Sequence, residues 1–246
     1  MSAFRDAVEQ HFPGAMPSSD YLAEVRHRVE PLGFTPDRTL PLVSICRDEL
    51  TTGFFGQIEA EWGLAFTLAG LGGVPTLGRT GWQAALSHVP DSDGRGCVLV
   101  FGFPHIGIEL DGTVGLTLRQ GQVDPTATCG ALSSIFQLWQ DNDLPAETDV
   151  DDFEATRLAL RLVDPQTRPT TLVDLTIAAL DAIEVDLWKA LDGAAVTDRH
   201  DVAVWCGVQI HGHDRDDWIW PRDAWYAGSD SHRRRLPGQV RAPDAE

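Results

Sequence analysis

The chain has 246 residues, of which 43% are hydrophobic and 23% are charged, ordinary proportions for a globular protein. Its 37 acidic residues outnumber 19 basic ones and give a formal net charge of −18, which argues against nucleic acid as a partner, because phosphate binding needs a dense cationic surface. No apolar run approaches the roughly 18–20 residues that cross a bilayer, and the N-terminus lacks the apolar centre of a signal peptide, so we expect a cytoplasmic protein without membrane contact.

The first eighty residues carry patterns typical of helices around one buried strand. Residues 1–30 favour two helices separated by a short loop. The mostly apolar run 40–46 predicts a buried strand. Helical spacing over 57–71 predicts a third helix, and we expect Gly72 and Gly73 to end it.

The middle of the chain adds elements of both kinds. In order, they are a short helix at 81–90, a strand at 97–103, a hairpin at 106–118 and a helix at 130–140. The hairpin is indicated by alternating apolar residues on both sides of Asp111 and Gly112, a pair suited to a type I′ turn.

The rest of the chain predicts two amphipathic helices, at 151–163 and 170–191, followed by a strand at 201–212. This mixture of strands and helices indicates an α/β or α+β protein. We predict one domain over 1–230 and a frayed tail over 231–246, in which the only basic cluster is solvated.

Three residues with metal-binding chemistry share a local pattern: Cys46, His105 and Cys129 each lie at the end of an apolar run, next to glycine or charge. In α/β sheets, the carboxyl ends of strands are where sites are built. Two thiolates and one imidazole form an open zinc site that leaves the fourth position for water. Their wide separation in the sequence indicates a site that is assembled by the fold.

The cysteines also permit a plainer interpretation. In a reducing compartment, the four cysteines are expected to be thiols and not disulfides. Cys97 and Cys206 lie inside apolar strand runs and are predicted to be buried hydrophobic residues. Cys46 and Cys129 can have the same role, with His105 as a hydrogen-bonded loop residue.

Several separate motifs resemble one family over nearly the whole chain, from about residue 8 to residue 228. In order, they are HFPGAM, VSICRDEL, WGLAFTLAGLGG, GRTGWQAALSHVP, FGFPHIGIELDG, TCGAL and GVQIHG. Together they resemble the limiting-CO2-inducible B/C (LCIB/LCIC) family, the theta-class, beta-like carbonic anhydrases known from algal carbon-concentrating systems.

This resemblance implies a fold like that of beta carbonic anhydrase, with a central mixed sheet flanked by helices, in a homodimer. It implies Zn2+ held by Cys46, His105 and Cys129, which match the family's Cys, His and Cys ligands. The activity implied is the reversible hydration of CO2 to bicarbonate and a proton by zinc-bound hydroxide.

The beta-class pattern of Cys-x-Asp-x-Arg followed by His-x-x-Cys matches only in part. Asp48 fits it, but Leu50 stands at the arginine position and Ile108 at the second cysteine position. These departures fit the theta-like branch and leave open which arginine orients Asp48. Arg47 is the first candidate and Arg79 the second, although Arg47 can instead form a surface ion pair.

The ligand set suggests a role for Asp48. Zinc with two thiolates and a neutral imidazole has almost no net charge, so it acidifies water less than a three-histidine site does. Asp48 can accept a hydrogen bond from the bound hydroxide, or it can ligate the zinc itself and close the site. His88 can shuttle the proton or simply end a helix, and His211 and His213 are predicted to be structural or pocket-lining.

CO2 is small and nonpolar, so the predicted pocket is partly apolar. We expect Phe54 and Phe55 to supply walls, although aromatic residues at such spacings are often plain core. Gly72 lets the backbone approach the site, or only ends a helix. Arg79 and His88 complete the predicted pocket.

Two other functions remain open at this point. One is a catalytically silent member of the same family, a zinc-stabilised protein that binds bicarbonate or a protein partner. The other is a different zinc hydrolase, but the His-x-Glu and Pro-Cys-x-x-Cys motifs of nucleobase deaminases are absent. A dinucleotide-binding Gly-x-Gly-x-x-Gly motif is absent as well.

Overall fold

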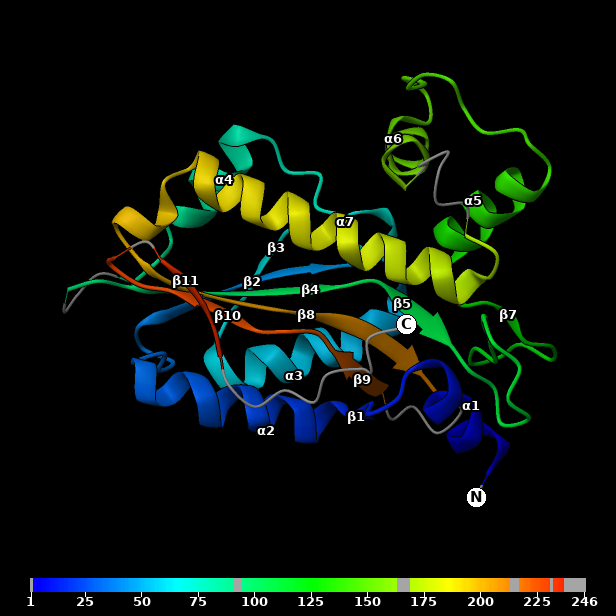
Figure 1. Ribbon diagram of the computed structural model, residues 1–246, viewed down its shortest axis with the longest axis horizontal. Coiled ribbons are helices and arrows are strands. Elements are labelled where there is room, and N and C mark those ends of the chain that lie inside the picture. The colour runs from blue at the N-terminus through cyan, green and yellow to red at the C-terminus, as the bar shows by residue number, and fades with distance from the viewer. Residues whose placement is uncertain (1, 91–93, 163–168, 213–216, 231, 237–246) are drawn as a thin grey trace.

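A mixed β-sheet runs through the centre of the computed structural model, with helices on both of its faces (Figure 1). The structure describes residues 2–90, 94–162, 169–212, 217–230 and 232–236. The main sheet contains β1 (Met16–Pro17), β2 (Thr39–Ile45), β3 (Phe66–Thr67), β4 (Cys97–Phe103), β5 (His105–Gly107), β8 (Asp201–His211), β9 (Asp217–Pro221), β10 (Trp225–Ala227) and β11 (Arg233–Arg235). A separate pair is formed by β6 (Leu116–Thr117) and β7 (Thr126–Ala127). The α/β fold class with a central mixed sheet is therefore confirmed.

The middle of the sheet is parallel and its margin is antiparallel. The strand order is β1-β9-β8-β4-β2-β3, and β2, β3, β4 and β8 run in one direction. β9 and β10 pair antiparallel with β8, while β5 continues beside the end of β8 as a parallel neighbour. In the β2–β4 pair, Ile45 lies opposite Phe103, so these two strands end level with each other.

Seven α-helices and four short 3-10 helices complete the part of the chain that the structure describes. The α-helices are α1 (Ala3–His11), α2 (Ser18–Val29), α3 (Thr52–Trp62), α4 (Arg79–Leu86), α5 (Gly130–Gln140), α6 (Phe153–Leu162) and α7 (Leu172–Gly193). The 3-10 helices are η1 (Glu30–Leu32), η2 (Glu49–Thr51), η3 (Leu71–Gly73) and η4 (Val196–Asp198). In Figure 1, α2 and α3 cover one face of the sheet and α4 and α7 the other, with α5 and α6 at one end.

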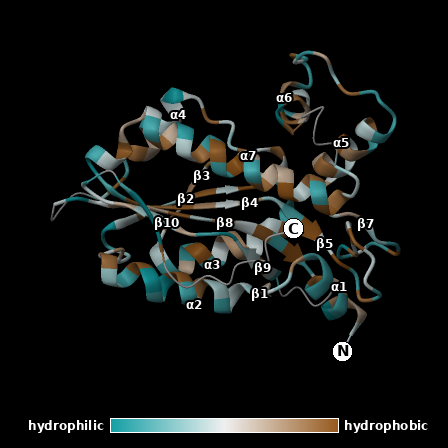
Figure 2. Cartoon of the chain, in the orientation of Figure 1, coloured by the Kyte–Doolittle hydropathy of each residue, from teal (hydrophilic) through white to brown (hydrophobic). Residues whose placement is uncertain are grey.

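Alternation along the strands produces two separate cores. Val98 and Val100 of β4 belong to the core beneath α7, whereas Leu99, Phe101 and Phe103 point to the opposite core beneath α2 and α3. Because both faces are covered, β4 is buried throughout and its sequence is almost continuously apolar. Figure 2 shows the apolar strands between helices whose outer turns are hydrophilic.

Most predicted elements are present. The strands predicted at 40–46, 97–103 and 201–212 are β2, β4 and β8. The predicted helices at 130–140 and 170–191 are α5 and α7. The four cysteines are buried free thiols, as predicted. No helix among the described residues has the length and apolar character that a membrane span requires.

The helix predicted over 57–71 is wrong at both ends. The observed helix, α3, starts at Thr52 and stops at Gly63, whose φ of +89° ends it. The chain then runs beside β2 as β3, and Leu68 N–H donates to the Val43 carbonyl at 2.8 Å. Apolar residues that had helical spacing are therefore used in a strand and in the 3-10 turn η3, because pairing with β2 outweighs the local helical pattern.

The hairpin predicted around Asp111 and Gly112 is present but shorter than predicted. Gly112 has a φ of +89°, but Asp111 does not have the positive φ that a type I′ turn requires. The flanking segments form a bridge between Ile108 and Val114, with backbone hydrogen bonds from Glu109 N–H to the Thr113 carbonyl at 2.9 Å and from Gly115 N–H to the Gly107 carbonyl at 2.7 Å. The predicted first strand of the hairpin instead pairs with β8 as β5, because that pairing buries it in the main sheet.

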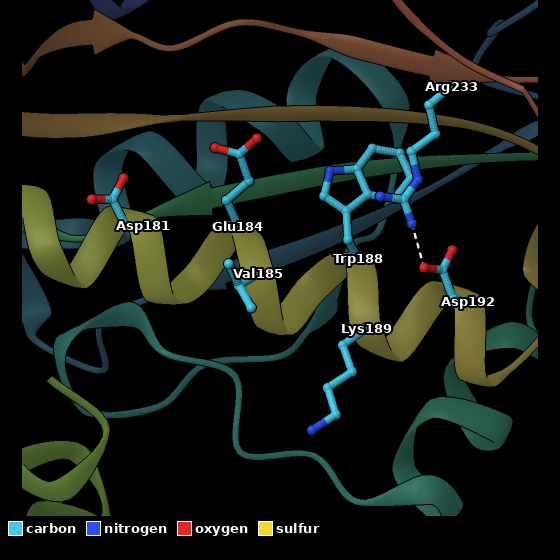
Figure 3. A pocket seen from close by; sticks show the side chains of 7 residues that line it. All are labelled: Asp181, Glu184, Val185, Trp188, Lys189, Asp192 and Arg233. Carbon is cyan, nitrogen blue, oxygen red and sulfur yellow. Dashed lines mark hydrogen bonds and ion pairs between the residues drawn. The ribbon is translucent and has the colours of Figure 1, made fainter. Parts of the chain in front are cut away.

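The tail predicted to fray from residue 231 includes β11, so its arginine cluster is not simply solvated. Arg233 stacks on Trp188 of α7 at 4.0 Å and forms an ion pair with Asp192 (Figure 3). Arg234 lies over the Tyr226 ring at 4.5 Å. Aromatic faces attract guanidinium groups, and this attraction accompanies the pairing of β11 with β10. Residues 237–246 of the predicted tail lie outside the described residues, and the single domain over 1–230 stays a prediction.

Gly73 holds the loop after β3 against β4, and replacing it should destabilise the fold. Its φ is +82°, and a Cβ there would lie 2.4 Å from the Phe103 carbonyl oxygen. We expect Gly73→Ala to lower the free energy of unfolding by about 2–4 kcal/mol, through backbone strain and overpacking. Urea denaturation measures this change.

Gly56→Ala is the matched control. Gly56 lies within α3, and a Cβ there would have no atom within 4 Å. This change should stabilise the protein by about 0.5–1 kcal/mol, because alanine favours helix. Equal effects of the two substitutions would contradict the close approach at Gly73.

Candidate metal centre

The structure brings Cys46, His105 and Cys129 together at one edge of the sheet. Cys46 directly follows β2, His105 opens β5, and Cys129 is the N-cap residue of α5. One donor atom from each residue lies within 4.8 Å of the others, and all three residues are buried. Among the described residues, this is the group of histidine, cysteine and acidic side chains with the geometry to hold a metal ion.

The parallel strands explain why two of these residues meet. β2 and β4 end level, and their carboxyl ends project Cys46 and His105 from the same edge. The third residue arrives from a distant loop and caps a helix. The backbone N–H of Asp48 acts to lower the pKa of Cys46, and that of Leu132, in the first turn of α5, acts to lower the pKa of Cys129. Both N–H groups therefore favour thiolates, the form in which cysteine binds metals.

A hydrogen bond between the two thiols shifts their pKa values in opposite directions. The hydrogen bond from Cys129 lowers the pKa of Cys46. The hydrogen bond to Cys46 raises the pKa of Cys129, and burial adds to this rise. A cation placed between the sulfurs would remove their competition for one proton, because its charge stabilises both thiolates.

His105 supplies the third donor atom. It is fully buried, and its Nδ1 lies 3.0 Å from His211 Nε2. His105 Nε2, in contrast, is buried without any hydrogen-bond partner. An unpaired buried nitrogen is costly unless a ligand satisfies it. The two sulfurs and this nitrogen therefore fit a metal that accepts a Cys2His donor set.

His211 links the centre to an acidic residue. Its Nδ1 lies 2.7 Å from Asp217 Oδ1, and both residues are buried. Burial lowers the pKa of His211, although the carboxylate of Asp217 beside it acts in the opposite direction. The structural role predicted for His211 is thus to connect His105 with Asp217 through hydrogen bonds. His213 lies outside the described residues.

Asp48 is held by an arginine that was not predicted. Arg119 Nη2 donates to Asp48 Oδ2 at 3.0 Å, and Leu50 N–H donates to Asp48 Oδ1 at 3.0 Å. Arg119 Nε also donates to Glu49 Oε1 at 2.7 Å, and this contact lowers the pKa of Glu49. Asp48 thus stands beside the three ligands without joining the group of donor atoms within 4.8 Å.

All five N–H groups of Arg119 are used within the chain. Besides Asp48 and Glu49, they reach Thr126 Oγ1 and the carbonyls of Ala127 and Thr128, the last three at 2.8, 2.8 and 2.9 Å. A guanidinium has no further donor, so Arg119 is a rigid support for Asp48. No motif or spacing connects Arg119 with Asp48, because 71 positions separate them.

The two arginines predicted to orient Asp48 lie elsewhere. Arg47 Nη1 donates to Glu154 Oε2 at 2.8 Å, and its side chain is 56% exposed, so it makes the surface ion pair that was the alternative. Arg79 is exposed and lines a separate hollow of about 650 Å3, over α4 and α7.

The other predicted pocket residues do not gather at the centre. Phe54 is fully buried in the core beneath α2 and α3, where its ring meets Phe103, and Phe55 packs on the same core. Gly72 approaches side chains of α5 and α6. His88 is exposed beside Phe66, in a hollow that also borders Thr39 and Leu40 at the opposite end of β2. The length of the strand separates His88 from Cys46, so its position just after α4 favours the alternative in which it only ends a helix.

A hollow of about 900 Å3 lies beside the metal-binding residues. Its lining comes mainly from the loop around η2, the segment after β6 and the ends of β8 and β9. Arg119, His211 and Asp217 all border it. Side chains that support Asp48 and His105 are therefore within reach of small molecules from solvent.

Arg119 should contribute more to stability than Arg47. Its side chain is 18% exposed, its partner Asp48 is 13% exposed, and its loss would leave that carboxylate unpaired. We expect Arg119→Ala to lower the free energy of unfolding by about 2–3 kcal/mol. Arg47→Ala, the control, should change it by less than about 0.5 kcal/mol. Thermal and urea denaturation of both variants measure the difference, and a larger loss in Arg47→Ala would contradict it.

Comparison with known proteins gives a consistent result. The family described as limiting CO2-inducible proteins B/C beta carbonic anhydrases matches residues 15–227. The crystal structure of PtLCIB4, a homolog of the limiting CO2-inducible protein LCIB, aligns with a TM-score of 0.81 and 25% identity, covering 95% of this chain and 99% of that one. The crystal structure of LCIB aligns with a TM-score of 0.74 and 29% identity, covering 92% and 96%. No curated protein matches the chain significantly.

Proposed function

Because the chain belongs to the limiting CO2-inducible proteins B/C family of beta carbonic anhydrases, we propose that it is a zinc-dependent carbonic anhydrase. The reaction is the reversible hydration of CO2 to bicarbonate and a proton. One observation carries the proposal: two thiols and an unpaired His105 nitrogen converge in a buried site, with Asp48 held beside them.

Zinc is the metal that this donor set favours. Cys2His ligation with an open fourth position is a known arrangement of catalytic zinc, and thiolates disfavour magnesium or calcium. When bound, zinc supplies Lewis acidity that lowers the pKa of a coordinated water. Cys46, His105 and Cys129 would hold the zinc. Asp48 does not ligate the metal in this proposal, because its carboxylate accepts hydrogen bonds from Arg119 and Leu50.

Asp48 orients the nucleophile in this proposal. A carboxylate can only accept hydrogen bonds, so Asp48 accepts the O–H proton of the attacking oxygen and leaves that oxygen's lone pair free for the carbon of CO2. Its 13% exposed side chain limits competition from bulk water. The ion pair with Arg119 holds Asp48 away from the metal ligands.

The hollow beside the centre is the route for CO2 and bicarbonate. Arg119 borders it, yet all of its N–H groups are already bonded within the chain. The product anion is therefore not held by this guanidinium, which favours release of bicarbonate. The homodimer and the cytoplasmic location stay predictions.

Metal content provides the first test. The purified chain should contain about one zinc per chain, and Cys46→Ser, His105→Ala or Cys129→Ser should each reduce this strongly, because a three-ligand site tolerates no loss. Mass spectrometry of the metal after gel filtration measures the ratio.

Cys97→Ser is the control for the metal measurement. Cys97 is equally buried, but it lies at the start of β4, where its sulfur contacts the Gly33 carbonyl at 3.4 Å. This variant should retain its zinc. Full zinc content in all three ligand variants would contradict the proposed site.

Catalysis is tested by stopped-flow CO2 hydration, with zinc determined in the same sample. We expect activity in the wild type and a loss of about 100-fold or more in Asp48→Ala, the order that a positioned proton-handling group contributes. Asp186→Ala removes an acid that pairs with Arg161 on the outer side of α7, and it should keep full activity. A zinc-replete but inactive wild type would contradict the enzyme and favour a silent, bicarbonate-binding member of the family.

A further inference from the structure

A continuous line of buried hydrogen bonds leads away from the candidate metal centre. Gln209 Nε2 donates to Asp217 Oδ2 at 2.8 Å, and Asp217 Oδ1 lies 2.7 Å from His211 Nδ1. His211 Nε2 in turn lies 3.0 Å from His105 Nδ1. All four side chains are buried, with exposures of 8% or less.

Strand register holds this line in place. His211 and Asp217 lie directly opposite each other in the antiparallel β8–β9 pair. His105 lies opposite Gln209 in the parallel β5–β8 pair. The two imidazoles meet nearly edge to face, with an interplanar angle of 84°. Three strands of the main sheet (Figure 1) therefore fix the positions of the four side chains.

When both imidazoles are neutral, the carboxylate determines the direction of every proton in the line. Asp217 can only accept, so His211 must donate from Nδ1. A neutral imidazole carries one N–H, which leaves His211 Nε2 as an acceptor. His105 must then donate from Nδ1, and its own single proton is used there. His105 Nε2 is left with a bare lone pair.

A separate observation agrees with a bare lone pair on His105 Nε2. His105 Nε2 is buried and has no hydrogen-bond partner in the chain. His105 also belongs to the group whose donor atoms lie within 4.8 Å of the Cys46 and Cys129 sulfurs. His105 Nε2, the nitrogen that carries no proton in this arrangement, is thus the nitrogen that has no hydrogen-bond partner among the described residues.

We infer that His211 and Asp217 are positioning residues that lock His105 in the tautomer with Nδ1 protonated, so that Nε2 is ready to bind metal before metal arrives. Partners of this kind on the other nitrogen of a ligating histidine fix its ring and raise its basicity. This role rests on the metal site of the proposed function, but it concerns a property of the metal-free chain.

The tautomer can be measured directly without metal. Long-range proton–nitrogen correlation spectra of 15N-labelled, metal-free wild type distinguish a protonated ring nitrogen from a bare one, and His105→Gln assigns the signals. We expect His105 to show a protonated Nδ1 and a bare Nε2. A dominant tautomer protonated at Nε2 would overturn the inference, and the tautomer itself is read from the wild type.

Asp217→Asn tests the cause. An amide can donate or accept, so the direction of the hydrogen bonds between position 217 and His105 is no longer fixed. The same substitution in serine protease triads yields the wrong histidine tautomer. We expect the Nε2-protonated form of His105 to appear in the metal-free spectrum. We also expect cobalt(II) binding, followed by its thiolate charge-transfer absorption, to weaken by about 10- to 100-fold.

Asp201→Asn is the matched control. It makes the same chemical change at the first residue of β8, where Asp201 pairs with Arg95 at 3.2 Å, far along the strand from His211. Spectrum and cobalt affinity should equal those of the wild type. If Asp217→Asn does not fold, His211→Gln replaces it, with the same loss of affinity expected. Unchanged tautomer and affinity in the folded variant would contradict the inference.

The two proposals fail in different ways. A wild type with the expected tautomer that binds neither zinc nor cobalt would contradict the proposed function alone. A zinc-loaded, active wild type whose metal-free His105 is protonated at Nε2 would contradict only the role of His211 and Asp217.

Discussion

The parallel pairing of β2 with β4 is the constraint on which the candidate metal centre depends. Because Ile45 and Phe103 lie opposite each other, Cys46 and His105, which follow them in the chain, lie at the same end of the strands. Cys46 and His105 therefore meet without any motif that joins them in sequence. The two apolar cores on either side hold this edge rigid, so the polar residues beyond it need only short supports: an N–H for each sulfur and His211 for the imidazole.

The centre combines groups that would be unstable apart. A buried thiolate, a buried carboxylate and an unpaired imidazole nitrogen each carry a desolvation cost. In this chain, Arg119 compensates Asp48 through a fully bonded guanidinium, and Asp217 orders the histidine pair from the other side. The desolvation free energy of the two sulfurs and of His105 Nε2 is not compensated within the part of the chain that the structure describes. One bound cation would compensate all three atoms. Stability and metal affinity are thus linked at this place.

Much of this arrangement could be predicted from local sequence, and the rest depends on contacts between distant segments. Cys46, His105 and Cys129 lie at the ends of apolar runs, so they could be singled out as candidate ligands, and a family resemblance supported the same three residues. Arg119 was not predictable, because 71 positions separate it from Asp48. The end of α3 at Gly63 was missed for a related reason: the apolar residues beyond it have helical spacing, but pairing with β2 decides their conformation.

The order of the elements along the chain has a consequence for synthesis. The three candidate ligands belong to the first 129 residues, whereas β8 and β9, which shield and orient His105, end at Pro221. At translation rates of about 5–20 residues per second, the ribosome needs roughly 5–20 s to make the intervening segment. During this interval, β4 lacks its neighbour β8, and both thiols are present on a chain that cannot yet order the imidazole. A correctly ordered set of ligands therefore forms late, when the last long strands have been added to the sheet.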